Sequence, residues 1–340
     1  MTKALLFLSF GGPNGPDDVV DFMANVTRGR NIPRERLAEV SKHYFLFGGK
    51  SPINEINLEL IARTEAALAQ AGISLPVYFG NRNWEPYLSD TVEKMIGDGI
   101  DEALVFATSA YGSYSGCRQY REDLANARQR ASNPSLRLFK LRHFYNHPDF
   151  VKPLQLGSIA AIERLSATFH LSEIEVLFSA HSVPLAMAQS SDYLPQLGFV
   201  ARHVKDAISS AFPQQIGHSQ VFQSRSGPPH QPWLEPDISD AMRSLCRDGK
   251  KRAFVVVPVG FISDHMEVIY DLDTLARQTA AELGAGFERV PTSSSSASFT
   301  NVIVDLVKEQ LYLGYTAPHL EGDPQPLAQC RQDCCLISNP

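Results

Sequence analysis

A histidine that directly follows an apolar run is the first residue whose type and place could do chemistry. His181 comes straight after the run EVLFSA, and Pro184 stops the backbone from continuing as strand or helix. Imidazole has an unperturbed pKa of about 6.5, so His181 could act as a base or as a metal ligand at neutral pH. A loop histidine hydrogen-bonded to backbone is the alternative, and it stays open on this residue alone.

The segment SDHMEVIYDLD carries three acidic residues at helical spacing. Asp264, Glu267 and Asp271 stand at positions i, i+3 and i+7, so a helix would place all three on one face, with His265 beside them. Such a line of carboxylates can pass a hard divalent cation or protons inward from solvent. The alternative is structural, because Asp264 and Glu267 also fit a capping box at a helix N-terminus.

Four of the five cysteines have the number and chemistry of a metal site. They are Cys117, Cys330, Cys334 and Cys335, and four is the usual complement for an iron–sulfur cluster or a structural zinc ion. Their C-terminal spacing, C-x3-C-C, matches neither the ferredoxin nor the zinc-ribbon pattern. Cys246 stands at a helical position and is expected to be a buried structural cysteine. An odd number of cysteines in so long a chain argues against a disulfide framework.

Two N-terminal segments could contact a ligand. SFGGPNGP lacks both the G-x-G-x-x-G spacing and the lysine of a phosphate loop, so a tight turn that a flat ligand can approach closely is the better interpretation. The next segment, NVTRGRNIPRER, is rich in arginine, which suits carboxylates or phosphates on a ligand. A solvated basic loop is equally compatible with it. Its arginines are Arg28, Arg30, Arg34 and Arg36.

The scaffold for these segments is predicted by alternating apolar runs and amphipathic stretches. Several runs are continuously apolar, which is typical of parallel strands covered on both faces. Alternating strands and helices indicate an α/β doubly wound fold, and their number predicts two similar halves that meet near residues 145–155. The expected strands are 4–10, 76–80, 102–108, 175–180, 219–224 and 252–259, and the expected helices include 54–71, 92–98, 124–131, 200–211 and 274–283.

Ligand sites in such folds lie past the carboxyl ends of the strands. The candidate segments all follow an expected strand, so we expect one common cleft that they line together. These segments are SFGGPNGP, TSAYGSYSGCRQY, AHSVP, QSRSGPP and GFISDHMEVIYDLD.

Composition limits the function classes. The 340 residues carry a net charge of −6, which argues against a nucleic-acid partner. No segment approaches the ~20 apolar residues of a membrane-spanning helix, and the N-terminal run 4–10 is interpreted as a buried strand. We therefore expect a cytoplasmic protein without a transmembrane segment. The tail 316–340 has no clear period and would be disordered unless something ties it down.

Taken together, the motifs resemble the ferrochelatase family over roughly residues 4–315. The resemblance is carried by LLFLSFGGP, GGKSPIN, SAHSVP, QSRSGPPHQPWLEPD and PVGFISDHMEVIYDLD. It implies two similar doubly wound (Rossmann-like) α/β domains with parallel four-stranded sheets and a porphyrin cleft between them. The expected limits are 1–145 for the N-terminal domain, which the C-terminal helix 298–315 joins, 146–297 for the second domain, and 316–340 for a cysteine-bearing tail.

The resemblance assigns catalytic and metal-path roles. His181 matches the family's active-site histidine, and Glu267 matches the glutamate that faces it across the porphyrin plane. Asp264, His265 and Asp271 match the polar residues behind that glutamate, a secondary path for the metal. We expect His181 and Glu267 on opposite faces of the ring, one handling incoming Fe²⁺ and the other accepting pyrrole protons. The order of these two roles stays open.

Substrate-binding roles follow in the same way. Ser51 and Tyr120 match positions that contact the porphyrin carboxylates, and Arg28 and Arg30 lie in the polar segment that replaces the apolar lip of membrane-bound relatives. Phe10 falls where some relatives place a tyrosine over the macrocycle, and a phenyl ring can stack there but cannot ligate iron.

A subset of the family resembles this chain in its cysteines, and the resemblance implies a [2Fe–2S] cluster held by Cys117, Cys330, Cys334 and Cys335. Insertion of iron is not a redox change, so a structural or iron-sensing role is expected for such a cluster.

The implied activity is that of a lyase of haem biosynthesis that forms metal–nitrogen bonds, with ferrous iron as a substrate. Coproporphyrin III carries four propionates, which favour a solvated and positively charged entrance to the cleft. Coproporphyrin III is therefore expected over protoporphyrin IX. The alternatives are a protoporphyrin IX ferrochelatase, a cobalt or nickel chelatase, and a non-catalytic porphyrin or haem carrier. We expect a monomer that meets an iron donor and other enzymes of the haem pathway.

Overall fold

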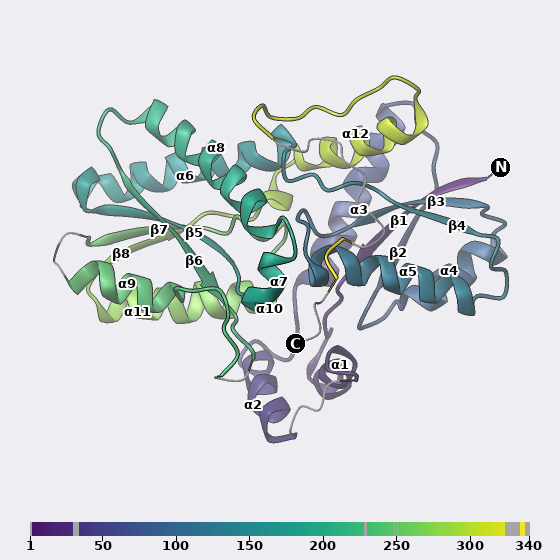
Figure 1. Ribbon diagram of the computed structural model, residues 1–340, viewed down its shortest axis with the longest axis horizontal. Helices are drawn as coiled ribbons and strands as arrows, with labels where there is room; N and C mark the ends of the chain where they lie inside the picture. Colours follow the sequence, from purple (N-terminus) through teal and green to yellow (C-terminus); the bar gives the residue numbers. More distant parts are fainter. Residues whose placement is uncertain are drawn as a thin grey trace.

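The protein has two α/β halves placed side by side, each a parallel sheet covered by helices on both faces (Figure 1). This is a computed structural model, which describes residues 2–29, 34–227, 230–247, 249, 251–323 and 334–336. Within these residues each sheet has four strands, so the predicted fold class is confirmed.

The first sheet contains β1 (Lys3–Ser9), β2 (Val77–Asn81), β3 (Glu102–Ala107) and β4 (Arg137–Lys140) in the order β2-β1-β3-β4, all parallel. β1 is central and continuously apolar because both of its faces are covered. Leu5 and Phe7 enter one core, whereas Leu6 and Leu8 enter another on the opposite face.

The second sheet repeats this topology with β5 (Ile174–His181), β6 (Gly217–Gln223), β7 (Ala253–Val257) and β8 (Gly286–Arg289) in the order β6-β5-β7-β8. β5 takes the central place that β1 has in the first sheet. The sequence analysis missed one edge strand in each sheet, β4 and β8, because RLFK and GFER are short and mix charged with apolar residues.

One shared layer of helices joins the halves. α3 (Ile53–Gln70), α6 (Pro148–Ser166), α8 (Tyr193–Ala211) and α12 (Phe299–Leu311) cover the same side of both sheets and contribute to one continuous core (Figure 1). α12 packs against α3 of the first half and α6 of the second. It ends at Leu311, before the expected limit of 315, because the backbone of Tyr312 is extended. The expected domain limits themselves stay predictions.

Separate helices cover the other side of each sheet. α4 (Leu88–Gly97) and α5 (Gln119–Arg130) lie under the first sheet, and α9 (Ile238–Arg247) and α11 (Arg277–Glu282) lie under the second (Figure 1). Two stretches of π-helix, η2 (Tyr114–Arg118) and η4 (Ile269–Ala276), lead into α5 and α11. Such widened turns are frequent at functional sites.

The excursion α1 (Val19–Val26) and α2 (Arg34–Phe45) lies outside both layers, below the gap between the halves in Figure 1. Its buried side chains Phe22 and Tyr44 pack against Met266, which belongs to the short helix α10 (Met266–Val268) of the second half. The excursion therefore reaches across to the segment that carries Glu267. No helix in the described ranges combines the length and the apolar character needed to cross a membrane.

Candidate active site

The carboxyl end of β5 presents His181, as the sequence predicted. The ladder with β6 pairs His181 with Gln223, and the next residue, Ser182, donates its backbone N–H to the Gln223 carbonyl. Tyr193 donates its hydroxyl to the carbonyl of His181 at 3.0 Å. Imidazole Nδ1 contacts the Ser182 carbonyl oxygen, so the ring turns its other nitrogen, Nε2, toward the second half's acidic segment.

Glu267 is the partner that meets this nitrogen. His181 Nε2 and Glu267 Oε2 lie 3.5 Å apart, although the residues are far apart in the chain. The helix that carries Glu267 begins just after His265, whose Nδ1 accepts the backbone N–H of Glu267 at 3.2 Å. The cap is therefore the imidazole of His265, and the capping-box alternative for Asp264 with Glu267 is wrong.

The pair is accessible and strongly coupled. The side chain of His181 is 33% exposed and that of Glu267 is 50% exposed, so a ligand can reach both. Burial disfavours the charged form of each group, but the hydrogen bond and the electrostatic attraction between them outweigh this effect. They raise the pKa of His181 above its ordinary value and lower the pKa of Glu267 to about 2. At neutral pH the site therefore contains an ionised carboxylate beside an imidazole with a raised affinity for protons.

The short contact corrects one expectation. With Nε2 and Oε2 only 3.5 Å apart, no macrocycle fits between these two atoms in this conformation. His181 and Glu267 therefore stand on one side of any flat ligand in this structure and not on opposite faces.

Asp271 extends the acidic surface along the π-helix. It accepts a hydrogen bond from the hydroxyl of Ser224, a residue held at φ 61°, where side chains other than glycine are uncommon. Burial, helped by the charge of Glu267, raises the pKa of Asp271 to about 6. His181 and Glu267 both act on it electrostatically, so these three groups form one coupled set. Asp271 can thus hold or release a proton near neutral pH.

Asp264 does not share this surface, so the expectation of three carboxylates on one helix face is wrong for it. It lies before the His265 cap and is therefore outside the helix. Its two oxygens accept hydrogen bonds from Arg289 at 3.1 and 3.0 Å, and Arg289 also pairs with Asp273 at 2.7 Å. His265 packs edge-on against Phe261, and burial lowers its pKa.

On the first half, Phe10 follows β1 and presents a 42% exposed ring. Its edge packs on Phe22 at 6.3 Å between ring centroids. The next residue, Gly11, has φ 83°, and a Cβ there would lie 2.9 Å from the Cβ of Asn81, so the close approach of the backbone requires glycine. The chain thus leaves an open aromatic face at the end of the central strand.

Tyr120 and Arg82 form a second aromatic layer near Phe10. The guanidinium of Arg82 lies 4.6 Å from the ring centroid of Tyr120 and 5.9 Å from that of Phe10. Arg82 is buried and forms an ion pair with Asp123. Tyr120 is buried too, and burial raises its pKa. Sequence reasoning missed Arg82, although it follows β2 and the rule of strand carboxyl ends would have found it.

Ser51 is held rigidly behind this surface. It is buried and donates its backbone N–H to the carbonyl of Pro13 at 2.9 Å. A Cβ on Gly12 would lie 2.7 Å from the Cβ of Ser51, and Asn54 Nδ2 donates to the Gly12 carbonyl at 2.7 Å. The segments SFGGP and GGKSPIN therefore pack tightly against each other.

Of the two arginines expected at the mouth, Arg28 is exposed and donates to Asn25 Oδ1. Arg30 lies outside the described residues.

Three of the four expected cluster cysteines are described. Cys117 is buried in η2, and Cys335 is buried at φ 55°. Burial raises the pKa of the Cys335 thiol to about 12, and the sulfurs of Cys334 and Cys117 add to the shift. Arg121 Nη1 donates to Cys334 Sγ at 3.3 Å. Cys330 lies outside the described residues, and among those described no three ligand side chains are arranged to hold a metal ion.

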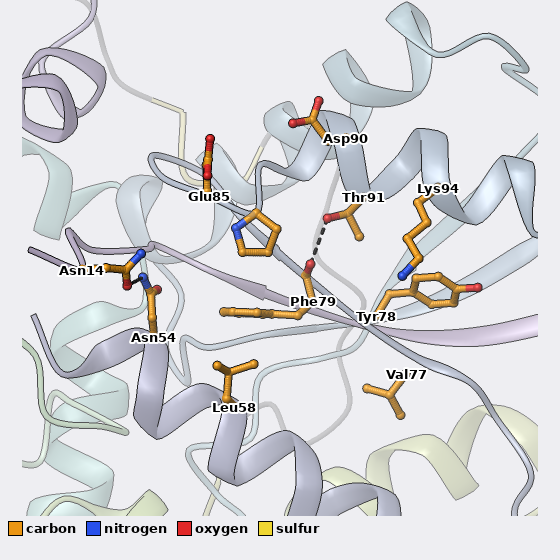
Figure 2. Close-up of a pocket in the computed structure, with 11 residues that line it drawn as sticks. Asn14, Asn54, Leu58, Val77, Tyr78, Phe79, Glu85, Asp90, Thr91 and Lys94 are labelled. Carbon is orange, nitrogen blue, oxygen red and sulfur yellow. Dashed lines mark hydrogen bonds between the residues drawn. The ribbon is translucent and has the colours of Figure 1, made fainter. Parts of the chain in front are cut away.

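Two hollows lie elsewhere. Figure 2 shows a pocket of about 460 Å³ between α3 and α4, where the outer edge of β2 carries Val77 and Phe79. Thr91 donates its hydroxyl to the Phe79 carbonyl at 2.8 Å across this edge. A smaller hollow of about 270 Å³ adjoins β6. Neither includes His181 or Glu267, so the site is identified by its chemistry and not by cavity size.

Comparison with known proteins places the chain among relatives of known name. The chain is 48% identical over 327 residues to a coproporphyrin III ferrochelatase of Mycolicibacterium smegmatis, covering 95% of this chain and 94% of that protein. It is 43% identical over 336 residues to a ferrochelatase of Rhodopirellula baltica, covering 98% and 93%. The solved structure of SirB from Bacillus subtilis with Fe³⁺ covers 94% of this chain and all of that one, with a TM-score of 0.50 and 13% identity, a likeness of fold alone. The family model for ferrochelatase matches residues 2–311, and the chain therefore belongs to the ferrochelatase family.

Proposed function

We propose that this protein inserts ferrous iron into coproporphyrin III and releases two pyrrole protons. The observation that carries the proposal is the contact between His181 Nε2 and Glu267 Oε2 at the accessible end of β5. Relatives that are 47–49% identical over most of the chain bear the name coproporphyrin III ferrochelatase. Imidazole and carboxylate are suitable ligands for iron that must be passed on, because they bind it less tightly than thiolates do.

The first half positions the tetrapyrrole in this proposal. The exposed ring of Phe10 stacks on one face of the macrocycle, and the substrate carboxylates lie toward Ser51 and Tyr120, both of which are buried. His181 and Glu267 approach from the other face as a pair. A flat porphyrin hides its nitrogen lone pairs in the ring plane, and binding energy from the rest of the macrocycle can drive the distortion that exposes them.

In this proposal, three ionisable groups of the second half take different steps of the reaction. Glu267, with a pKa of about 2, stays ionised and receives Fe²⁺ as an oxygen ligand. His181, with its raised pKa, accepts a pyrrole proton at Nε2 once the metal has passed. Asp271, with a pKa of about 6, takes up the proton from this coupled set and shares it with solvent through Ser224. Two protons leave as Fe²⁺ enters, so charge balances.

The substrate has one specific competitor. Coproporphyrin III is supported by the arginine-rich segment around Arg28, which suits four propionates. Protoporphyrin IX, which has two propionates and two vinyl groups, is favoured by a different observation. The same excursion exposes large apolar side chains, namely Val20, Phe45 and Leu46.

We also propose that Cys117, Cys330, Cys334 and Cys335 hold a [2Fe–2S] cluster. The electrostatic action of Cys334 and Cys117 on Cys335 supports it, as does the hydrogen bond from Arg121 to the sulfur of Cys334. When bound, the cluster supplies a structural cross-link between the tail and η2, because insertion is not a redox reaction.

A detergent-free insertion assay with Fe²⁺ and either porphyrin tests the activity. We expect turnover of both, with a higher kcat/KM for coproporphyrin III. A preference for protoporphyrin IX would overturn the substrate assignment, and porphyrin binding without any turnover would identify a carrier. Cobalt and nickel in place of iron test the metal. Absorption between ~400 and 600 nm, with iron and sulfide in the purified protein, tests the cluster.

Further proposals concern the setting of the enzyme. We propose a monomer in the cytoplasm that receives iron from a donor protein, passes its product to other haem-pathway enzymes and has no nucleic-acid partner. Size-exclusion chromatography with light scattering tests the monomer, and a stable dimer would contradict it.

A further inference from the structure

Gln223, the last residue of β6, carries a buried amide that has no part in the chemistry proposed above. The residue is 1% exposed. It pairs with His181 in the sheet, and its backbone carbonyl accepts the N–H of Ser182 at 2.8 Å. A buried amide needs partners for both its oxygen and its nitrogen, because it has given up its bonds to water. The partners of this amide connect the two residues of the proposed metal path.

The oxygen of the Gln223 amide is bound to the strand that carries His181. Ser179, which is fully buried on β5, donates its hydroxyl to Gln223 Oε1 at 2.6 Å. Ser179 stands two residues before His181, so the two side chains point to the same face of the sheet. The hydrogen bond therefore orients the amide from the end of β5.

The nitrogen of the same amide faces the backbone of Glu267. Gln223 Nε2 donates to the Glu267 carbonyl oxygen at 3.4 Å. A carbonyl oxygen can only accept, so this contact and the hydrogen bond from Ser179 agree on which end of the amide carries the oxygen. One side chain therefore spans from β5 to the helix that carries Glu267.

Glu267 needs such support more than His181 does. His181 belongs to a strand of eight residues, and Tyr193 donates its hydroxyl to the His181 carbonyl. Glu267 lies on α10, which has only three residues before the π-helix η4 begins. Its backbone N–H is bound to His265 and its carbonyl to Gln223. These two hydrogen bonds orient the backbone of Glu267 from outside its own short helix.

This support fixes the separation between two functional groups. His181 Nε2 and Glu267 Oε2 lie 3.5 Å apart. Within the described part of the chain, the side chain of Gln223 is hydrogen-bonded to neither group, so it acts through their positions. A metal ion that contacts both groups requires them at a fixed separation, and loss of a residue that orients metal ligands typically costs about 10–100-fold in affinity or activity.

We propose that Gln223 is a positioning residue of the insertion reaction: it joins Ser179 on β5 to the backbone of Glu267 and so keeps the Glu267 carboxylate beside the imidazole of His181. This inference rests on the proposed function, and it adds a residue that touches neither the metal nor the porphyrin. Loss of the bridge should reduce turnover and weaken metal binding to the pair, without weakening porphyrin binding.

The test compares Gln223→Met, which keeps the length of the side chain but removes both hydrogen bonds, with Ser179→Ala and with the double variant. Gln220→Met is the matched control, because Gln220 lies earlier on the same strand and donates Nε2 to the Phe178 carbonyl of β5 at 2.8 Å. For each variant, kcat and KM for coproporphyrin III are measured with Fe²⁺. Co²⁺ is also titrated into the porphyrin-free protein, and the visible absorption that His181→Ala abolishes reports binding at the pair.

We expect Gln223→Met to lower kcat by about 10–100-fold and to raise the Kd for Co²⁺ by a similar factor, with KM for coproporphyrin III within about 2-fold of wild type. Ser179→Ala should lose less. The double variant should be no worse than Gln223→Met, because both changes break the same bridge. Gln220→Met should keep the wild-type kcat and Kd, whatever its Tm.

A wild-type kcat and a wild-type Kd for Co²⁺ in Gln223→Met would overturn the inference. Equal losses in Gln220→Met would overturn it too, because they would mark a general effect of hydrogen bonding in the sheet. A wild-type protein without turnover would overturn the proposed function, whereas the Co²⁺ titrations would still decide whether Gln223 positions the pair. If Gln223→Met does not fold, Ser179→Ala is compared with Gln220→Met, and a wild-type kcat and Kd in Ser179→Ala would then refute the bridge.

Discussion

The two halves share one topology but end their central strands in opposite chemistry. β1 is followed by the exposed aromatic ring of Phe10 and a glycine turn, whereas β5 ends in His181 beside Glu267. The order β2-β1-β3-β4 is repeated as β6-β5-β7-β8, so the same scaffold position serves both. In the proposed function, the first half holds the flat ligand and the second half exchanges a metal ion and protons. Variants at the two strand ends should therefore fail in different ways.

The largest expected effect follows from His181→Ala. Removing the imidazole takes away the base that accepts pyrrole protons, so we expect kcat to fall by roughly 10²–10⁴-fold while porphyrin binding stays near wild type. Steady-state insertion kinetics and porphyrin fluorescence quenching measure the two quantities. Equal losses of binding and turnover would break the division between the halves, and retained turnover would remove His181 from the mechanism.

The next effect comes from Glu267→Gln, which keeps the shape but removes the charge. We expect kcat to fall by about 10²-fold because a ligand for iron is lost. Glu267 is also what raises the pKa of His181, so its removal lowers that pKa. The imidazole must be neutral to accept a proton, and the acid limb of kcat against pH should therefore move to lower pH. An acid limb at an unchanged pH would contradict the coupling of the pair.

The same pair sets a pH dependence of stability with a definite sign. The carboxyl of Glu267 has a lowered pKa in the fold, so its contribution is present above about pH 4.5 and is lost as the pH falls toward 2. His181 has a raised pKa, so its contribution is complete below about pH 6.5 and is lost as the pH rises through the folded value. The free energies of unfolding of the wild type and of Glu267→Gln should therefore differ most between about pH 4.5 and about pH 6.5.

The strand ends explain how far sequence reasoning reached. His181 and Glu267 were predictable because each follows a continuously apolar strand, and parallel strands bring their carboxyl ends to one edge. β4 and β8 were not, because each has only four residues and mixes charged with apolar side chains, which leaves no clear hydrophobic pattern. Asp264 was misplaced, because its side chain has a partner distant in sequence, Arg289, that no local spacing reveals.

A smaller effect, of a different kind, is expected on the first half. Tyr120→Phe removes a buried hydroxyl that meets the substrate carboxylate in the proposed function and leaves the ring under Arg82. We expect KM for coproporphyrin III to rise by about 5–50-fold, as for the loss of one hydrogen bond to a charged group, with kcat within about 2-fold. Initial-rate kinetics at saturating Fe²⁺ measure both. A fall in kcat with KM unchanged would place Tyr120 in the chemistry and blur the contrast between the halves.

The smallest effect on rate is expected from Asp264→Asn. This variant tests whether Asp264 acts on the metal path, as its spacing in the sequence suggested, or only in an ion pair, as the structure shows. Asp264 stands in the acidic segment but is held by Arg289, whose side chain is 13% exposed, and it is not among the groups that shift the pKa of Asp271. Loss of the ion pair should cost about 1–2 kcal/mol of stability and lower Tm by a few degrees, while kcat for insertion stays within about 2-fold. Thermal unfolding and insertion assays check both. If the rate falls as far as in Glu267→Gln, the metal passes Asp264 after all, and the acidic face expected from spacing alone would be the better description of the path.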